Sequence, residues 1–246
     1  MKFSVRELVF YERDVRLRMP FRFGVATLTE APQAFARARI RLPDGREAEG
    51  AAAELLVPKW FDKNPALTNE NNFEQLRASL RQARAAYLAG GENTAYGHSR
   101  PTVGLVENFG PALLDRALLD ALCRALGISF YEALRRNVPG IAVPGNTDDL
   151  AAFDMDEFLA GLKPRQAIAA RHTVGLVDPI TVGDKKLDDG LPESLDEVLQ
   201  RYGHRWFKLK LGGDAAADLE RLGAIASVLD PHFTRLDEPY HATLDG

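Results

Sequence analysis

The stretch that most constrains the fold is residues 206–214, which reads Trp-Phe-Lys-Leu-Lys-Leu-Gly-Gly-Asp. It has the pattern of a short β-strand that runs into a helix. Successive side chains on a strand point to opposite faces, so Lys208 and Lys210 point together while the apolar residues beside them point the other way. An ammonium group inside a fold is costly unless it is paired or loses its proton. Two lysines on one face of an apolar strand therefore indicate either a water-exposed sheet face or a functional site.

The residues after this strand favour a site. Gly212 and Gly213 predict a turn, and an amphipathic helix follows, which together indicate a βα unit with both sheet faces covered. In such units catalytic groups usually lie at the C-terminal ends of the strands. Each lysine there raises the cost of protonating the other, so one of them could be neutral near pH 7 and serve as a base. A sheet face open to water is the alternative.

Length and composition exclude several classes of protein. The chain has 246 residues, enough for one or two domains. Its net charge of -4, with both signs interspersed, provides no electrostatic footprint for nucleic acid or for an anionic membrane. The N-terminus lacks the apolar segment of a signal peptide and no later run could span a bilayer, so we expect a cytoplasmic protein. The single cysteine, Cys123, lies in an apolar helical pattern, which predicts a packing role and excludes a disulfide framework.

The first half of the chain has strands followed by helices. The expected elements are strands at residues 5–18, 35–42 and 47–54 and helices at residues 73–87, 111–126 and 130–136. We expect a loop at residues 20–28, and Pro-Asp-Gly-Arg at residues 43–46 predicts the turn of a hairpin. Asn71 or Asn72 is expected to cap the first helix, and Pro111 is expected in the first turn of the second. This order is typical of an α+β module.

The second half alternates strands and helices. Turn formers at residues 139–140 and 144–146 mark the expected boundary between domains 1–140 and 141–246. A helix capped by Asp154 comes first. The later elements are expected to be strands at residues 168–177, 206–211 and 240–244, with helices after Ser194 and Asp214 between them. The order β-α-β-α-β indicates a parallel sheet with right-handed crossovers.

Four segments carry a family resemblance. They are residues 19–24 with the threonines that follow; the hairpin with Glu49, Gly50 and Glu54; the helical run at residues 111–127; and residues 207–214 with Asp218 and Arg221 behind them. The lysine pair matches a K-x-K motif, and residues 243–246, Thr-Leu-Asp-Gly, look like the start of a D-x-N metal segment. On these residues the chain resembles the enolase superfamily, within it the mandelate racemase and muconate lactonizing enzyme branches.

The resemblance implies a fold and a reaction. The fold would be an α+β N-terminal cap domain followed by an α/β domain, a partial TIM-type barrel with three parallel strands. The reaction would be removal of the proton α to a carboxylate through an enediolate, with Mg²⁺ held by three acidic residues at strand ends, as in racemases, epimerases, cycloisomerases and dehydratases. By position Lys210 resembles the base, and Lys208 the neighbour that makes its protonation more costly and helps to bind the carboxylate. Asp245 resembles the first metal ligand.

Substrate and partners are expected from the same comparison. We expect a small carboxylic acid as substrate and a homo-oligomer in the complete protein. Phe21, Arg22 and Phe23 in the first loop and Trp60 in the irregular segment at residues 57–65 are candidates for substrate selection, since sites are normally built on such loops. Arg22 could pair with a distal carboxylate, and a plain surface arginine is the alternative. His172 could face the site or be a core or edge histidine.

The chain departs from the family pattern in three places. Residues 137–140 replace a glycine-rich ending of the cap helices, and residues 178–192 form a longer first βα connection than is typical. Only three barrel strands are expected, so we expect the remaining metal ligands and the opposite catalytic group to lie beyond Gly246, and this chain alone to be a truncated, inactive form. One alternative is a non-catalytic remnant or interaction module. Another is a phosphate bound by the amides of residues 211–213 with Lys210 as counter-charge, although no complete phosphate-loop motif is present.

Overall fold

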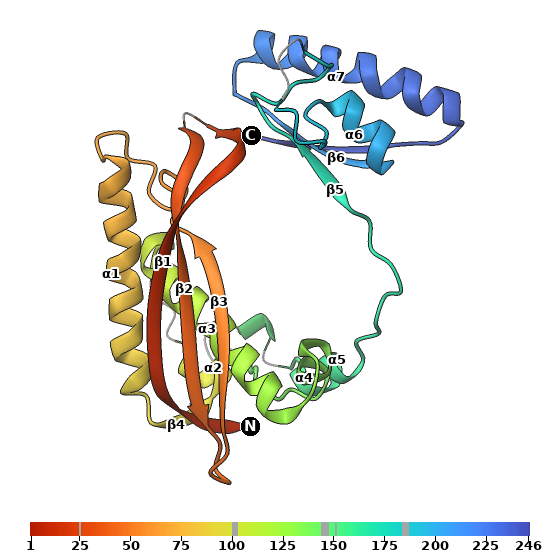
Figure 1. Ribbon diagram of the computed structural model, residues 1–246. Coiled ribbons are helices and arrows are strands. Elements are labelled where there is room, and N and C mark those ends of the chain that lie inside the picture. The colour runs from red at the N-terminus through yellow and green to blue at the C-terminus, as the bar shows by residue number, and fades with distance from the viewer. Residues whose placement is uncertain (25, 100–102, 144–147, 151, 184–186) are drawn as a thin grey trace. The chain divides into compact units, whose positions relative to one another are not determined.

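The computed structural model describes residues 1–246 except 25, 100–102, 144–147, 151 and 184–186 (Figure 1). The chain divides into two compact units. Unit 1 contains Met1–Val15 and Glu30–Pro164, and unit 2 contains Arg16–Thr29 and Arg165–Gly246. Of the two turn-forming stretches expected at the domain boundary, residues 139–140 lie inside unit 1, and residues 144–146 lie outside the described residues. Among the described residues, no helix is long and apolar enough to cross a membrane.

Antiparallel strands form the sheet that opens the chain. They are β1 (Lys2–Phe23), β2 (Ala26–Arg41), β3 (Glu47–Leu55) and β4 (Glu92–Thr94), in the order β3-β2-β1-β4. The expected hairpin is confirmed, because β2 and β3 pair from Arg41 and Glu47 outward across the turn at residues 43–46. Gly45 has a φ of 88°, a left-handed conformation that suits glycine in such a turn.

The prediction of a loop at residues 20–28 is wrong. Strand β1 continues through Pro20 to Phe23, and β2 begins at Ala26. The burial of Leu17, Met19, Phe21 and Phe23 exceeds that of the residues between them, so the two-residue period of a strand continues past the proline. The fixed φ of proline is compatible with extended backbone, which is why Pro20 does not end the strand. Gly24, with a φ of 51°, turns the chain; Val25 lies outside the described residues.

Helices cover one face of this sheet. Helix α1 (Asn69–Leu88) packs against α3 (Leu105–Leu126), and α3 packs on β3. A Cβ atom on Gly50 would lie 2.1 Å from the backbone nitrogen of Ala121, so α3 lies directly on the strand at this glycine. The N-cap of α1 is Thr68, not Asn71 or Asn72 as predicted; Asn71 instead returns its side chain to the backbone N–H of Thr68, which completes a capping box.

Helix α3 begins before Pro111, contrary to the prediction. Proline has no N–H, so it cannot donate to the carbonyl of Glu107 one turn earlier. The Ser79 hydroxyl of α1 donates to that carbonyl at 2.8 Å, and it accepts from the N–H of Gly110 at 2.9 Å. A neighbouring helix therefore replaces the missing donor, and Pro111 is accommodated inside the helix.

Shorter elements complete unit 1. They are α2 (Ala95–His98), α4 (Phe130–Arg135), the 3-10 turn η1 (Asp148–Leu150) and α5 (Met155–Ala160). The predicted helices after residue 130 and after Asp154 are confirmed, and β4 and α2 were not predicted. Beneath α2, Asp115 accepts hydrogen bonds from the hydroxyls of Tyr87 and Ser99, at 2.7 and 2.9 Å. Burial raises the pKa of Asp115 above its ordinary value.

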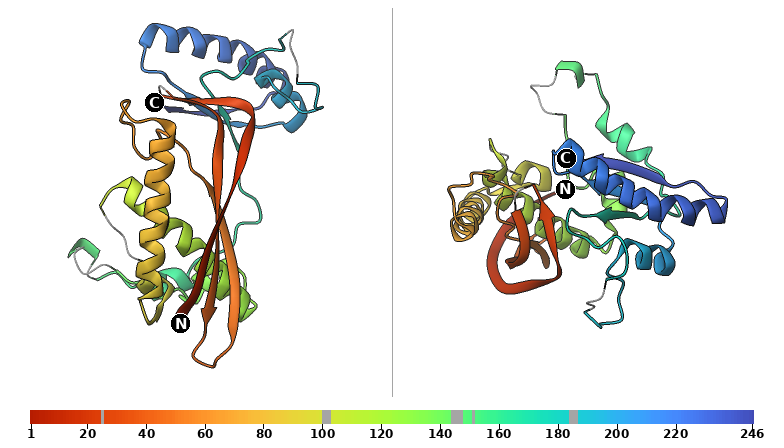
Figure 2. Two further views of the ribbon diagram at one scale, coloured as in Figure 1. Left: turned by 60° about the vertical axis from the view of Figure 1, so that its left-hand side comes forward. Right: turned by 90° about the horizontal axis from the view of Figure 1, so that it is seen from above.

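The C-terminal part of unit 2, coloured teal to blue in Figure 2, contains the expected parallel sheet, in the order β5-β6-β7. Its elements are β5 (Arg171–Val174), α6 (Leu195–Tyr202), β6 (Trp206–Lys210), α7 (Ala215–Leu236) and β7 (His241–Asp245). Strand β5 is shorter than predicted, and Ile168 before it is 87% exposed. Phe207 and Leu209 pack in one cluster with apolar residues of both helices, so α6 and α7 cover the same face of the sheet.

Candidate active site at the lysine strand

The two lysines of β6 meet one carboxylate. The alternation predicted for this strand is confirmed, since Phe207 and Leu209 are buried and Lys208 and Lys210 are half-buried on the opposite face. Parallel pairing brings Lys210 beside Asp245 of β7. Lys208 Nζ lies 2.9 Å from Asp245 Oδ1, and Lys210 Nζ contacts Asp245 Oδ2. The structure thus brings together the three residues predicted as base, modulator and metal ligand.

The electrostatics of this cluster follow from its geometry. Hydrogen bonds from Lys210 first, and then from Lys208, lower the pKa of Asp245 from its usual value, so the carboxylate is ionised at neutral pH. Its negative charge offsets the repulsion between the two ammonium groups. A lysine accepts a proton only when its amine is neutral and free to reach the donor, and in this structure the Nζ atom of Lys210 contacts the Asp245 carboxylate.

Asp245 is a suitable ligand for a hard cation, but it is one ligand only. Its side chain is 33% exposed, ends a strand and offers two carboxylate oxygens, both of which a lysine now contacts. The described part of the chain contains no group of three or more His, Cys, Asp or Glu residues that could hold a metal ion. Because Mg²⁺ requires several oxygen ligands, these residues fit such an ion in kind but do not form a complete site.

The turn after β6 does not offer a free phosphate site. The N–H groups of Gly212 and Gly213, which would have to bind the anion, donate to the two carboxylate oxygens of Asp218 at 2.7 and 2.9 Å. Lys210, the proposed counter-charge, contacts Asp245. An internal carboxylate therefore occupies the anion-binding amides, and this argues against the phosphate interpretation.

The four candidates for substrate selection fall in two units. Phe21, Arg22 and Phe23 lie near the hairpin tip in unit 2, where Phe23 is buried, the rings of Phe21 and Phe23 are 5.8 Å apart and Arg22 is exposed. Trp60 lies in unit 1 and is 47% exposed. Trp60 thus belongs to a different unit from the other three, and a role in substrate choice stays a prediction for all four.

His172 does not share a face with the lysines. It pairs with Phe207 in the parallel register, so it belongs to the helix-covered face of the sheet. Its ring stacks on that of His204 with centroids 5.6 Å apart, and burial lowers its pKa from the ordinary value. These contacts favour the alternative of a core or edge histidine.

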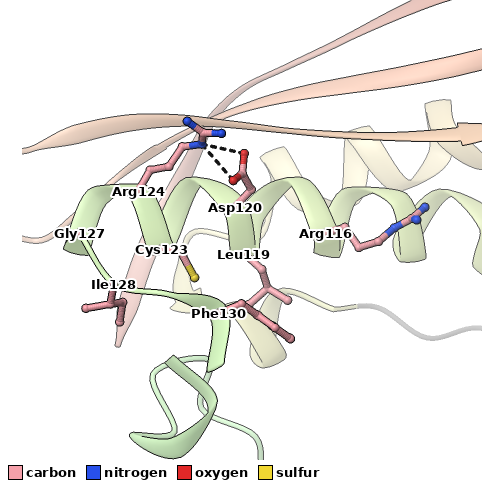
Figure 3. A pocket seen from close by; sticks show the side chains of 8 residues that line it. All are labelled: Arg116, Leu119, Asp120, Cys123, Arg124, Gly127, Ile128 and Phe130. Atoms are coloured by element: carbon pink, nitrogen blue, oxygen red, sulfur yellow. Dashed lines mark hydrogen bonds and ion pairs between the residues drawn. The ribbon is translucent and has the colours of Figure 1, made fainter. Parts of the chain in front are cut away.

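A cavity in unit 1 was not predicted from the sequence. It has a volume of about 630 Å³ and lies along α3 and α4, lined by Arg116, Leu119, Asp120, Cys123, Arg124, Gly127, Ile128 and Phe130 (Figure 3). Arg124 is paired with Asp120, and burial raises the pKa of the Cys123 thiol. A thiol with a raised pKa is a poor nucleophile, in keeping with the predicted packing role of Cys123.

Comparisons with known proteins decide the fold. No protein-family model and no curated protein matches the sequence. Solved structures do match: an enolase from Bradyrhizobium complexed with magnesium and mandelic acid aligns with a TM-score of 0.59 at 15% identity, over 100% of this chain and 54% of that chain. Muconate lactonizing enzyme from Mycobacterium smegmatis aligns with a TM-score of 0.57 at 19% identity, over 100% and 52%. The chain has the enolase superfamily fold.

A solved racemase structure aligns with this chain to a similar extent. N-succinyl Arg/Lys racemase from Bacillus cereus aligns with a TM-score of 0.56 at 15% identity, over 100% of this chain and 52% of that chain. The predicted cap and partial α/β barrel are therefore confirmed as an enolase superfamily fold. The chain spans about half the length of the solved structures that it matches.

Proposed function

We propose that this chain supplies the cap and first barrel strands of an enzyme that removes the proton from the carbon next to a carboxylate group. The observation that carries the proposal is the cluster of Lys208, Lys210 and Asp245 on adjacent parallel strands of an enolase superfamily fold. Racemases, epimerases and lactonizing enzymes with this fold support the reaction class. Since those chains are about twice as long, we assign the activity to a longer protein that contains this chain.

The two lysines have different roles in this proposal. Lys210, with 12% of its side chain exposed, is the base, and its neutral Nζ atom takes the proton from the substrate carbon. Lys208, with 24% exposed, keeps its charge and binds the substrate carboxylate.

The proposed cofactor is Mg²⁺ and the proposed substrate is a small carboxylic acid. Solved structures with this fold hold magnesium, and one also holds mandelic acid. Asp245 would supply one oxygen ligand, and further ligands would come from the rest of the longer protein. When bound, Mg²⁺ supplies positive charge where negative charge develops on the carboxylate oxygens.

Proton exchange in the longer enzyme tests the base. Lys210→Ala should slow deuterium incorporation at the α-carbon, followed by NMR in deuterated water, by about 10²- to 10⁴-fold. Lys210→Arg should fail as well, because guanidinium does not lose its proton in this pH range. Lys163→Ala, at an exposed lysine of unit 1, is the matched control and should keep the wild-type rate. Exchange at a wild-type rate in Lys210→Ala would exclude the assignment.

A second candidate function is a non-catalytic interaction module. The surroundings of Asp245 support this candidate. Both its oxygens contact lysines, and the described residues contain no group of three side chains that could hold a metal ion. Calorimetric titration of the 246-residue chain with Mg²⁺ should show weak or no binding that Asp245→Asn leaves unchanged. Binding that is both tight and lost in Asp245→Asn would show that this chain holds the metal itself.

A further inference from the structure

One arginine in the hairpin tip makes an unusually complete set of contacts. Arg18 Nε and Nη2 donate to the two oxygens of Asp189 at 2.5 and 2.8 Å, which is a bidentate pair. Its Nη2 and Nη1 atoms also donate to the backbone carbonyls of Leu191 and Pro192, each at 3.0 Å. A single guanidinium therefore binds four acceptors of one short loop. We call the contact between Arg18 and residues 189–192 the clasp.

The loop that receives Arg18 is itself held in shape. The Asp189 carboxylate accepts from the backbone N–H of Leu191 at 3.0 Å, and Arg201 of α6 donates to the Gly190 carbonyl at 2.5 Å. The Arg18 side chain lowers the pKa of Asp189 to about 2, so the carboxylate is charged at any physiological pH. The acceptors are thus preorganised, which is the condition under which a partly exposed ion pair contributes more than an isolated one.

Apolar packing leaves a gap beside the tip. Phe23 is buried, but a cavity of about 340 Å³ lies between Met19 and Phe21 of the hairpin and residues such as Leu195 and Val198 of α6. The surfaces that face this cavity are not closely packed. The directional hydrogen bonds of the clasp add a defined geometry beside the cavity, and this gives a use to residues 189–192.

The clasp lies close to the predicted selection residues. Phe21 follows Arg18 by three positions, about 10 Å along a strand, and Arg22 lies on the same face of the strand as Arg18. We propose that Asp189 is a positioning residue, which through Arg18 holds the hairpin tip so that Phe21 and Arg22 contact the substrate. This inference rests on the proposed function and adds to it the residue that sets the selecting segment in place.

Hydrogen exchange on the 246-residue chain tests the clasp without any assay of activity. Asp189→Ala should speed amide exchange in peptides from residues 16–23 by about fivefold or more, because the tip loses its anchor. Arg18→Lys, which keeps the charge but not the bidentate geometry, should lie between wild type and Asp189→Ala. Glu238→Ala, which removes the 2.7 Å pair with Arg205 in the same unit, is the control and should leave these peptides unchanged. Unchanged exchange in Asp189→Ala would overturn the proposal.

Kinetics of the longer enzyme test the link to substrate choice. With carboxylic acids that differ only at the end distant from the reacting carbon, Asp189→Ala should raise KM about tenfold for the preferred acid and leave kcat within about twofold. Arg18→Lys should recover part of the loss. Equal falls in kcat for all acids, or an unchanged KM, would overturn the selection role. Absence of α-proton exchange in the wild-type enzyme would instead disprove the proposed function, and the amide exchange result would still decide the clasp.

Discussion

The two units differ in how much of each sheet is covered by apolar packing. In unit 1, α1 and α3 bury an extended apolar cluster against the sheet, and Leu118 is one of its completely buried members. In unit 2, a smaller cluster lies on the helix side of the sheet, the opposite face carries Lys208 and Lys210, and four of the five residues of β7 are exposed. The comparison teaches that the helices of unit 1 bury more apolar residues than those of unit 2, and that the sheet of unit 2 keeps a charged face which its own helices do not cover.

The largest effect should come from opening each core separately. Leu118→Ala in unit 1 and Leu229→Ala in unit 2 remove side chains that are 0% and 1% exposed, and each should lower the free energy of unfolding by about 2–5 kcal/mol. Hydrogen exchange mass spectrometry should show the first loss in unit 1 peptides and the second in unit 2 peptides. Equal loss of protection in both units after either change would show that they unfold together.

A pair of glycines sharpens the comparison at a smaller scale. Gly50→Ala would force a methyl group against the backbone of α3 and should destabilise unit 1 by about 1–3 kcal/mol. Gly223→Ala adds a methyl group in open space in the middle of α7 and should stabilise unit 2 by about 0.5–1 kcal/mol. Urea unfolding of both variants measures the two signs. A stabilising Gly50→Ala would mean that α3 can move away from β3.

Unit 1 should lose stability as pH rises through the titration of Asp115. Burial raises the pKa of Asp115 in the folded state. The stability that its protonated form contributes is therefore fully present below the pKa of the unfolded chain, near 3.8, and is lost as pH rises through the pKa of the folded state. Asp115→Asn should abolish this part of the pH dependence and keep the hydrogen bond from Tyr87. Urea unfolding between pH 3 and 7, followed in unit 1, tests it; the same pH dependence in the variant would assign it to another group.

Unit 2 should respond to pH with the opposite sign and the smallest effect. The lysines lower the pKa of Asp245 in the folded state. The stability that its ionised form contributes is therefore present above the pKa of the unfolded chain, near 3.8, and is lost as pH falls through the lower pKa of the folded state. The ion pairs of Asp245 with the two lysines are partly exposed, so water and salt weaken them. Asp245→Asn should flatten this dependence in the same urea experiment at low salt. A steeper fall of stability at acid pH in the variant would contradict the assignment.

Local patterns predicted most of the fold because nearby residues determine those elements. Ser194 and Glu197 form the expected capping box of α6, and the glycine turn at residues 43–46 sets the register of the hairpin formed by β2 and β3. The alternation in β6 predicted which face carries the lysines, and the family resemblance predicted that Asp245 would join them. Such predictions from local patterns need no knowledge of contacts between residues that are distant in the sequence.

Some of the errors depend on partners that are distant in the sequence, whereas others, such as the loop at residues 20–28 and the N-cap of α1, are local. The start of α3 was missed because the donor that accommodates Pro111 is Ser79 of another helix. The phosphate alternative stayed open for a local reason, because the pattern does not show that the Asp218 carboxylate, five and six positions away, accepts from the amides of the turn after β6. Arg18 and Asp189 carry no local signal of their pairing, so the sequence singled out Arg22, its neighbour in the same hairpin, and not the arginine that makes the clasp.

The clasp also has a consequence for the order of folding during synthesis. Arg18 and Asp189 are separated by 171 positions, and the hairpin that carries Arg18 is among the first segments to be made. At typical rates of translation its partner loop follows roughly 10 to 35 s later. The hairpin can form from its own local contacts in microseconds, so its tip must wait without its anchor through most of this interval. The clasp therefore cannot form before residues 189–192 have been made, which places docking of the tip after the synthesis of most of the chain.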